Sequence, residues 1–98
     1  MLKRLEQNEK LMEIIKKGVW LVDFSATWCG PCRMLEPVLE SASESYNIVT
    51  IDVDRHSELA SSYGIMSVPS LLIFNNGELK NRQVGYKNLE EIKELMDI

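Results

Sequence analysis

The chain has 98 residues, of which 45% are hydrophobic and 27% are charged. These proportions are typical of one ordinary globular domain and exclude a disordered or collagen-like chain. Eleven basic and fifteen acidic side chains leave a net charge of −4, which argues against a protein that binds nucleic acid or anionic membranes. We therefore expect residues 1–98 to form a single domain.

Hydrophobic residues occur only in short runs. The longest uninterrupted runs, at residues 19–22 and 71–74, have four residues, whereas a bilayer-spanning helix needs about 20. The first eighteen residues mix basic and acidic side chains and contain no continuous apolar segment, so they do not resemble a signal peptide. We therefore expect no membrane span and a cytoplasmic location.

The first quarter of the chain predicts a short strand at residues 2–5, then a helix, then a buried strand. The helix is indicated by apolar residues on one helical face: Leu11, Met12, Ile14 and Ile15. Asn8 is a candidate cap for this helix, and Gly18 is a candidate stop. Residues 19–24 form an apolar run interrupted by Asp23, which is typical of a strand buried on both faces. We place this strand in the centre of a sheet.

A second, longer helix is predicted to begin near Pro31, because proline is favourable in a first helical turn. Its apolar residues recur at helical spacing: Leu35, Val38, Leu39, Ala42 and Tyr46. Pro37 lies inside this helix and should bend its axis. The β-branched segment at residues 48–53 predicts another strand. One helix separates it from the first buried strand, so the two should be parallel.

The second half of the chain predicts a third, brief helix ending at Gly64, then a hairpin and a final helix. Asn76-Gly77 separates two extended segments, which should therefore be antiparallel. The second of them, at residues 79–84, is polar enough for a sheet edge. Asn88 and Glu91 predict a capping box at the start of the last helix.

The order of these elements predicts the α/β class, with a central mixed β-sheet of four to five strands flanked on both faces by about four helices. Met34 and Met96 lie on amphipathic helices and are interpreted as core fillers. His56 lies near a helix start, where we expect it to be solvated or to cap the helix.

The chemistry-bearing motif is Cys29-Gly30-Pro31-Cys32, between the buried strand and the second helix. Free backbone N–H groups and the helix dipole would stabilise a thiolate at Cys29, so its pKa should lie below the ~8.5 of a free thiol. Cys32 lies one turn further into the helix, where it should be more buried and less ionised. The pair therefore divides into an attacking and a resolving thiol.

Other uses of the two cysteines are weaker. A structural zinc site takes four ligands, and the chain offers only Cys29, Cys32 and His56 of the usual type. Haem attachment requires histidine after the second cysteine, where this chain has Arg33. A disulfide closing such a short loop stabilises by about 2 kcal/mol at most, which is a poor structural reason for one. The motif therefore favours redox chemistry.

Two segments resemble a known family. Residues 24–34, Phe-Ser-Ala-Thr-Trp-Cys-Gly-Pro-Cys-Arg-Met, are similar to the active-site segment of thioredoxins, and residues 63–70 are similar to the loop that carries the cis-proline of that family. The resemblance implies the thioredoxin fold and a protein-disulfide reductase that binds no cofactor or metal. It implies recharging by a thioredoxin reductase, which draws electrons from NADPH through FAD, and a reductase fed by ferredoxin or another donor stays open as the alternative. Its other partners would be disulfide-containing proteins, and we expect a monomer.

Asp23 lies in the strand predicted to be buried, where ionisation is costly, so its pKa should be raised. A purely structural carboxyl would hydrogen-bond a backbone end. The resemblance instead implies that Asp23 takes the proton of Cys32, through water, when the mixed disulfide is resolved. Some thioredoxins have a lysine beside this carboxylate, where this chain has Thr50. Without that cation Asp23 should be harder to ionise.

Pro69 could simply begin a strand. The resemblance implies instead that the Val68-Pro69 bond is cis and faces the cysteines, which leaves the Val68 backbone free to pair with an extended substrate. Trp28 could be an ordinary core residue, but beside a reactive cysteine it fits an apolar docking patch better. The expected members of that patch are Trp28, Gly30, Pro31, Met66, Val68 and Gly85.

Two other functions stay open. Disulfide oxidation or isomerisation is disfavoured by the Gly-Pro pair between the cysteines and by the N-terminal segment, which does not resemble an export signal. A thioredoxin-like binding subunit with incidental cysteines is the alternative from a different class.

Overall fold

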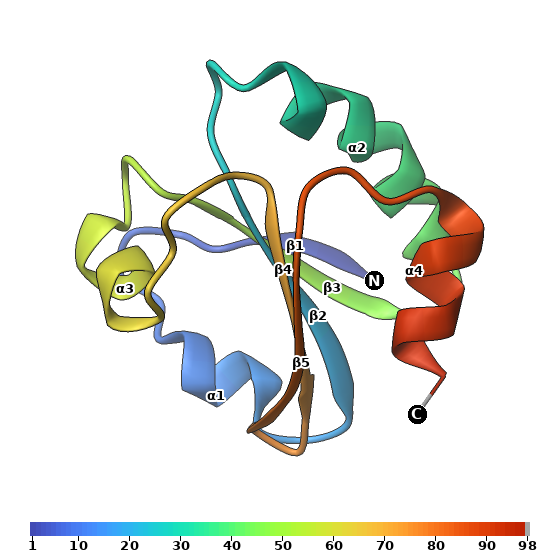
Figure 1. Ribbon diagram of the computed structural model, residues 1–98. Coiled ribbons are helices and arrows are strands. Elements are labelled where there is room, and N and C mark those ends of the chain that lie inside the picture. Colours follow the sequence, from blue (N-terminus) through green and yellow to red (C-terminus); the bar gives the residue numbers. More distant parts are fainter. Residues whose placement is uncertain (98) are drawn as a thin grey trace.

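The computed structural model describes residues 1–97, which form five strands and four helices (Figure 1). In chain order these elements are β1 Leu2–Arg4, α1 Leu11–Ile15, β2 Val19–Ser25, α2 Gly30–Ala42, β3 Asn47–Asp52, α3 Ser57–Ser62, β4 Ser70–Asn75, β5 Glu78–Val84 and α4 Leu89–Met96. The predicted order of elements is confirmed, including the short first strand. No helix in this described part of the chain has both the length and the apolar character needed to cross a bilayer.

The five strands form one mixed sheet in the order β1-β3-β2-β4-β5. As predicted, β2 lies at the centre, β3 runs parallel to it, and the β4–β5 hairpin is antiparallel. The polar strand β5 lies at one edge, also as predicted. β1 pairs with β3 in parallel at the other edge. The carboxyl ends of β2 and β3 therefore lie side by side at one end of the sheet.

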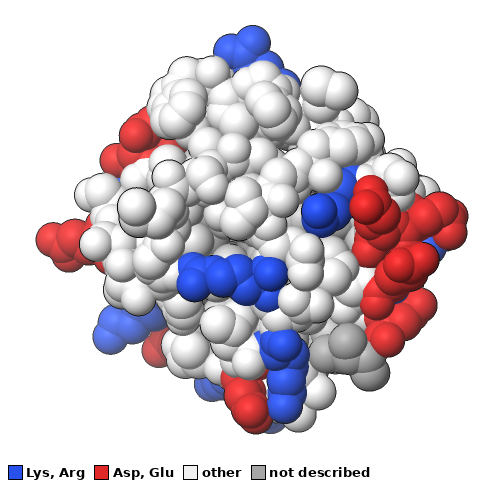
Figure 2. Space-filling model, viewed as in Figure 1, with Lys and Arg blue, Asp and Glu red and all other residues white. Residues whose placement is uncertain are grey.

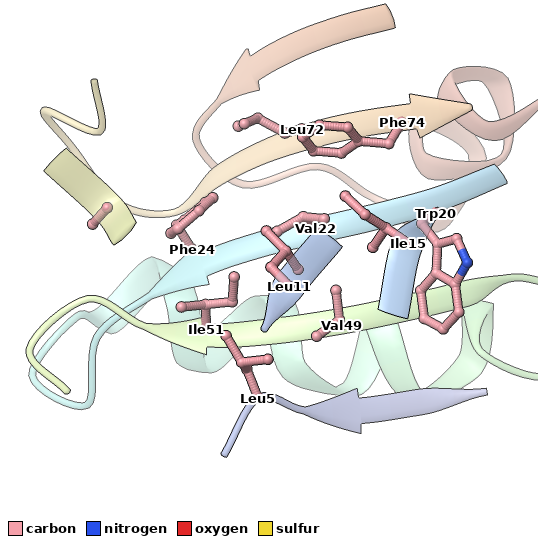
Figure 3. Packing of buried hydrophobic residues seen from close by; sticks show 11 residues of the cluster. Leu5, Leu11, Ile15, Trp20, Val22, Phe24, Val49, Ile51, Leu72 and Phe74 are labelled. Atoms are coloured by element: carbon pink, nitrogen blue, oxygen red, sulfur yellow. The ribbon is translucent and has the colours of Figure 1, made fainter. Parts of the chain in front are cut away.

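Alternation along β2 divides the core into two layers. Trp20, Val22 and Phe24 pack with α1 and α3, as Figure 3 shows for the cluster around them. Leu21 lies on the opposite face with buried residues of α2 and α4. Asp23, two residues further on, belongs to this second face. Each fully buried large apolar side chain contributes roughly 1.5–3 kcal/mol to the stability of the fold. Burying a polar side chain such as Asp23 in the same layer instead costs free energy unless the side chain is hydrogen-bonded.

Two local predictions are confirmed in detail. The Asn88 side chain accepts a hydrogen bond from the Glu91 amide at 2.9 Å, and the Glu91 side chain accepts one from the Asn88 amide at 3.0 Å. This is the capping box. In the hairpin, Asn76 and Gly77 have φ values of 52° and 83°, the left-handed conformations that a type I′ turn requires.

Three predictions about the first two helices are wrong. Asn8 does not cap α1, because Lys10 occupies that position and makes no side-chain cap bond. Met12 is 47% exposed, since this five-residue helix buries Leu11 and Ile15 against the sheet. Tyr46 lies beyond the end of α2.

Met34 is also corrected, because its side chain is 64% exposed, whereas Met96 is buried as predicted. The buried side of α2 carries Cys32, Leu35, Leu39 and Ala42. A helix packed on one face of a sheet leaves its other side in water, and Met34 lies on that side.

Candidate functional site

The cysteine motif lies where β2 ends and α2 begins. Cys29 is the N-cap of α2, as predicted, and Pro31 lies in the first turn, where the helix needs no backbone donor. Cys29 and Cys32 form a disulfide with a Cα–Cα distance of 5.3 Å, within the usual range. The strand-to-helix transition thus fixes both sulfurs at the carboxyl end of the central strand.

The environment of the two sulfurs is asymmetric. The Cys32 amide donates to Cys29 Sγ at 3.2 Å, so a backbone N–H of the first helical turn points at Cys29. After reduction such a donor stabilises a thiolate. Burial distinguishes the two residues only slightly, with exposed fractions of 6% for Cys29 and 4% for Cys32. The expected difference in burial is therefore small, and the helix N-terminus is the stronger cause of asymmetry.

The loop before β4 lies against Cys29. Its Val68–Pro69 peptide bond is cis, as the resemblance implied. The Val68 carbonyl oxygen is 3.7 Å from Cys29 Sγ. The Gly85 amide donates to the Pro69 carbonyl at 2.8 Å, which ties the end of β5 to the same loop. Residues distant in sequence therefore surround the disulfide.

The surface around the disulfide is largely apolar. Trp28 is 66% exposed and Met66 is 94% exposed, while Val68 is half-buried. Gly30 and Pro31, which separate the two cysteines in the sequence, are also exposed. In Figure 2 the upper end of the molecule, where α2 begins, is mostly white apart from basic atoms at its top, whereas acidic side chains gather over α4. A largely apolar surface of this kind can contact polypeptide chains of varied sequence.

Two residues that sequence reasoning missed hold this surface in place. Asp54 Oδ2 accepts a hydrogen bond from the Trp28 indole at 2.9 Å, across 26 positions of the chain. Arg33 donates twice from its guanidinium to the Thr27 carbonyl, at 3.0 and 3.3 Å. Hydrophobic periodicity gives no signal for either contact, because both residues are polar and exposed.

Asp23 is buried in β2 and faces α2. Its side chain is 4% exposed, and its Oδ1 has no hydrogen-bond partner in the described part of the chain. Burial, with a smaller contribution from Glu36, raises the pKa of Asp23 to about 7. A structural carboxyl with its oxygens satisfied by backbone donors does not fit this atom. The carboxyl can therefore gain and lose a proton near neutral pH.

A hollow of about 70 Å³ leads to Asp23. Its lining residues are Arg4, Asp23, Ser25, Ala26, Thr27, Glu36, Thr50 and Asp52. Thr50 is the register partner of Asp23 on the neighbouring strand β3, as the resemblance implied. This volume is large enough for a water molecule beside the carboxyl.

His56 plays no part in this site. Its Nε2 lies 3.2 Å from the Leu5 carbonyl oxygen, and it occupies the N-cap position of α3 without a side-chain cap bond. His56 therefore lies at the start of the helix, as its place in the sequence predicted, and is half-buried, but its side chain does not cap the helix. Within residues 1–97, no three His, Cys, Asp or Glu side chains are grouped so that they could hold a metal ion.

Residues 3–98 match the Thioredoxin family. A thioredoxin of Bacillus subtilis is 46% identical over 85 residues, covering 83% of this chain and 82% of the relative. A thioredoxin of Staphylococcus epidermidis is 44% identical over 87 residues, covering 85% of this chain and 84% of the relative.

Solved structures of similar shape carry the same family name. A mutant thioredoxin from Halobacterium salinarum superposes with a TM-score of 0.90 at 37% identity, covering 98% of this chain and 88% of the other. Schistosoma mansoni thioredoxin superposes with a TM-score of 0.88 at 33% identity, covering 97% of this chain and 92% of the other. The fold that the resemblance implied is thereby confirmed.

Proposed function

The chain belongs to the thioredoxin family, and we propose that Cys29 is its attacking thiol, Cys32 its resolving thiol and Asp23 the proton acceptor of Cys32. The protein is a protein-disulfide oxidoreductase, and its redox centre is the Cys29–Cys32 pair. The observation that carries the assignment of roles is the Cys32 amide directed at Cys29 Sγ at the N-terminus of α2.

The exchange proceeds in two displacements. The Cys29 thiolate attacks one sulfur of a substrate disulfide, and the other substrate sulfur leaves as a thiolate. Cys32 then loses its proton and attacks Cys29 Sγ, which breaks the mixed disulfide and releases the second substrate thiolate. Two electrons pass from the cysteine pair to the substrate, and the pair ends as the disulfide.

The N-cap position supports Cys29 as the attacker. The first N–H groups of a helix have no intrahelical acceptor, so they are free to bind an anion. The Cys29 thiolate would receive the Cys32 N–H and the positive end of the α2 dipole. Cys32 lies inside the helix and has no comparable position.

The proton of Cys32 needs an acceptor on its buried side. Asp23 is on the face of β2 that packs against α2, and a pKa of about 7 leaves both of its protonation states populated near neutral pH. The hollow beside Asp23 can hold a water that relays the proton. Asp23 would return that proton when the disulfide is reduced again.

Substrate docking is assigned to the surface beside the disulfide. The apolar docking patch consists of Trp28, Gly30, Pro31, Met66, Val68 and Gly85. The Val68 carbonyl lies beside Cys29 Sγ, so an extended peptide that paired with the Val68 backbone would bring its own sulfur to Cys29. This arrangement favours recognition through main-chain atoms and a tolerant apolar contact.

Family membership also supports a partner and a location. We assign recharging to a thioredoxin reductase that takes electrons from NADPH through FAD, while the chain itself needs no bound cofactor. Its substrates are disulfide-containing proteins, and its place of action is the cytoplasm. Purified reductase with NADPH should reduce the disulfide of this protein, whereas NADPH alone should not.

Trapping with two matched variants tests the roles of the cysteines. Reduced Cys32→Ser protein should form stable mixed disulfides with disulfide-bonded insulin, because the resolving thiol is missing. Reduced Cys29→Ser protein should trap far less. Mass spectrometry should locate the mixed disulfide at Cys29. Equal trapping by both variants would contradict this assignment. A mixed disulfide through Cys32 in the wild-type chain would reverse it.

A further inference from the structure

The hollow beside Asp23 is lined by an acidic side chain, Glu36, that the exchange mechanism does not use. Glu36 lies on α2 one turn after Cys32, so the two side chains lie on the same side of the helix. Glu36 is exposed, yet it lines the same hollow as the buried Asp23. An exposed acidic side chain therefore shares this hollow with the carboxyl that accepts the Cys32 proton.

We propose that Glu36 is a positioning residue of the exchange reaction, which acts through Asp23 by holding the proton on that carboxyl. This inference rests on the proposed role of Asp23. When Asp23 takes the proton from Cys32 Sγ, its carboxylate becomes neutral and the repulsion from Glu36 disappears. The anion at position 36 therefore makes Asp23 a stronger proton acceptor.

Asp23 has charged, neutral and apolar neighbours, and among them Glu36 is the charge that raises its pKa. Arg4 approaches the hollow from β1, and Asp52 lines it at the end of β3. The neighbouring strand β4 places the apolar Leu71 beside Asp23, and Thr50 on β3 is neutral. Burial is the main cause of the raised pKa of Asp23, and the charge that adds to it is Glu36.

A metal site is a poor alternative for this hollow. Asp23, Glu36 and Asp52 all line it, but within residues 1–97 they are not grouped closely enough to hold a metal ion. The unpartnered Oδ1 of Asp23 therefore needs another explanation. Protonation provides one, because a neutral carboxyl carries a much smaller desolvation cost than a carboxylate.

Charge variants at position 36 test the inference, and the oxidised protein gives a readout independent of activity. The carboxyl 13C resonance of Asp23 should titrate near neutral pH in the wild-type chain. In Glu36→Gln its midpoint should fall by roughly half a pH unit, as expected for removing one exposed charge near a buried group. In Glu36→Lys the fall should be larger. Both variants should fold, because position 36 is exposed.

Glu40→Gln is the matched control. Glu40 lies one turn further along α2, is also exposed and does not line the Asp23 hollow, so its removal should leave the Asp23 midpoint unchanged. The pH dependence of mixed-disulfide resolution by Cys32 should move in the acid direction in Glu36→Gln by the same amount as the NMR midpoint, and not move in Glu40→Gln.

The outcomes separate this inference from the proposed function. An Asp23 midpoint that Glu36→Gln leaves unchanged, or that Glu40→Gln moves equally, would overturn the role of Glu36 while leaving Asp23 as the acceptor. If resolution in Asp23→Asn kept the wild-type rate and pH profile, the proposed role of Asp23 would fall, and the role of Glu36 with it.

Discussion

The indole of Trp28 donates a hydrogen bond to Asp54 Oδ2 at 2.9 Å, which links the loop before Cys29 to the segment after β3. Strands β2 and β3 are parallel, so their carboxyl ends lie at the same end of the sheet. Trp28 is mostly exposed, so this bond, rather than packing, sets the orientation of its ring. The ring of the residue next to Cys29 is therefore held in a defined position.

Asp54→Ala should loosen Trp28 without unfolding the protein. We expect a stability loss of about 1 kcal/mol or less, since an exposed hydrogen bond contributes little, together with a several-fold higher KM for a protein disulfide. The indole N–H resonance of Trp28 should exchange faster with solvent. Asp54→Asn retains an acceptor and should stay close to wild type. An Asp54→Ala protein with unchanged indole exchange would show that the bond does not hold the ring.

Asp23→Asn should be more stable than the wild-type chain at high pH. The folded-state pKa of Asp23, about 7, lies above its unfolded value near 4, so the folded protein holds a proton that the unfolded chain has released. The contribution of Asp23 to stability therefore falls as pH rises from about 4 to about 7, by up to ~1.36 kcal/mol per unit. The accumulated loss is on the order of 4 kcal/mol at most.

Urea unfolding of the oxidised proteins at several pH values measures this effect. The stability difference between Asp23→Asn and wild type should be near zero at pH 4, grow through pH 7 and become constant above it. Resolution of mixed disulfides should be slower in the variant. A stability difference that does not depend on pH would contradict the raised pKa of Asp23.

Met66→Gln tests the docking patch with little change in side-chain size. Met66 is 94% exposed, so the substitution should leave stability within about 0.5 kcal/mol of wild type. Reduction of a protein disulfide should show a KM raised several-fold, while reduction of a small disulfide should hardly change. Met12→Gln, on α1 and also exposed, is the control and should behave as wild type with both substrates. Identical kinetics for the two variants would exclude Met66 from substrate contact.

Asn88→Ala should destabilise the fold without affecting the chemistry. The capping box gives two orphan backbone groups at the start of α4 their hydrogen bonds, and losing an N-cap side chain costs about 1 kcal/mol. Thermal unfolding should show a lower melting temperature, and kcat/KM for insulin reduction at 25 °C should be unchanged. Asn88→Ser keeps an N-cap acceptor and should recover most of the loss.

Local sequence patterns predicted the features that depend on neighbouring residues. Asn76-Gly77 determines a tight turn because both residues tolerate positive φ. Successive side chains of a strand point to opposite faces of the sheet, so the nearly continuous apolar run at residues 19–24 requires burial on both faces. This requirement places β2 at the centre of the sheet. Cys29 is at a helix N-terminus because an extended apolar run gives way there to helical periodicity. Met34 was misplaced because periodicity near a helix start does not show which side meets the sheet.

Contacts between distant segments were decided only by the tertiary structure. The Trp28–Asp54 bond and the approach of Glu36 to Asp23 join residues whose types alone indicate nothing about their partners. They arise because parallel pairing aligns the ends of β2 and β3, and because α2 packs on the face to which Asp23 points. The sequence by itself determined a redox-active dithiol at the start of a helix. The packing of the sheet and helices decided which carboxyl, indole and peptide bond surround it, because such contacts follow from global burial rather than from local periodicity.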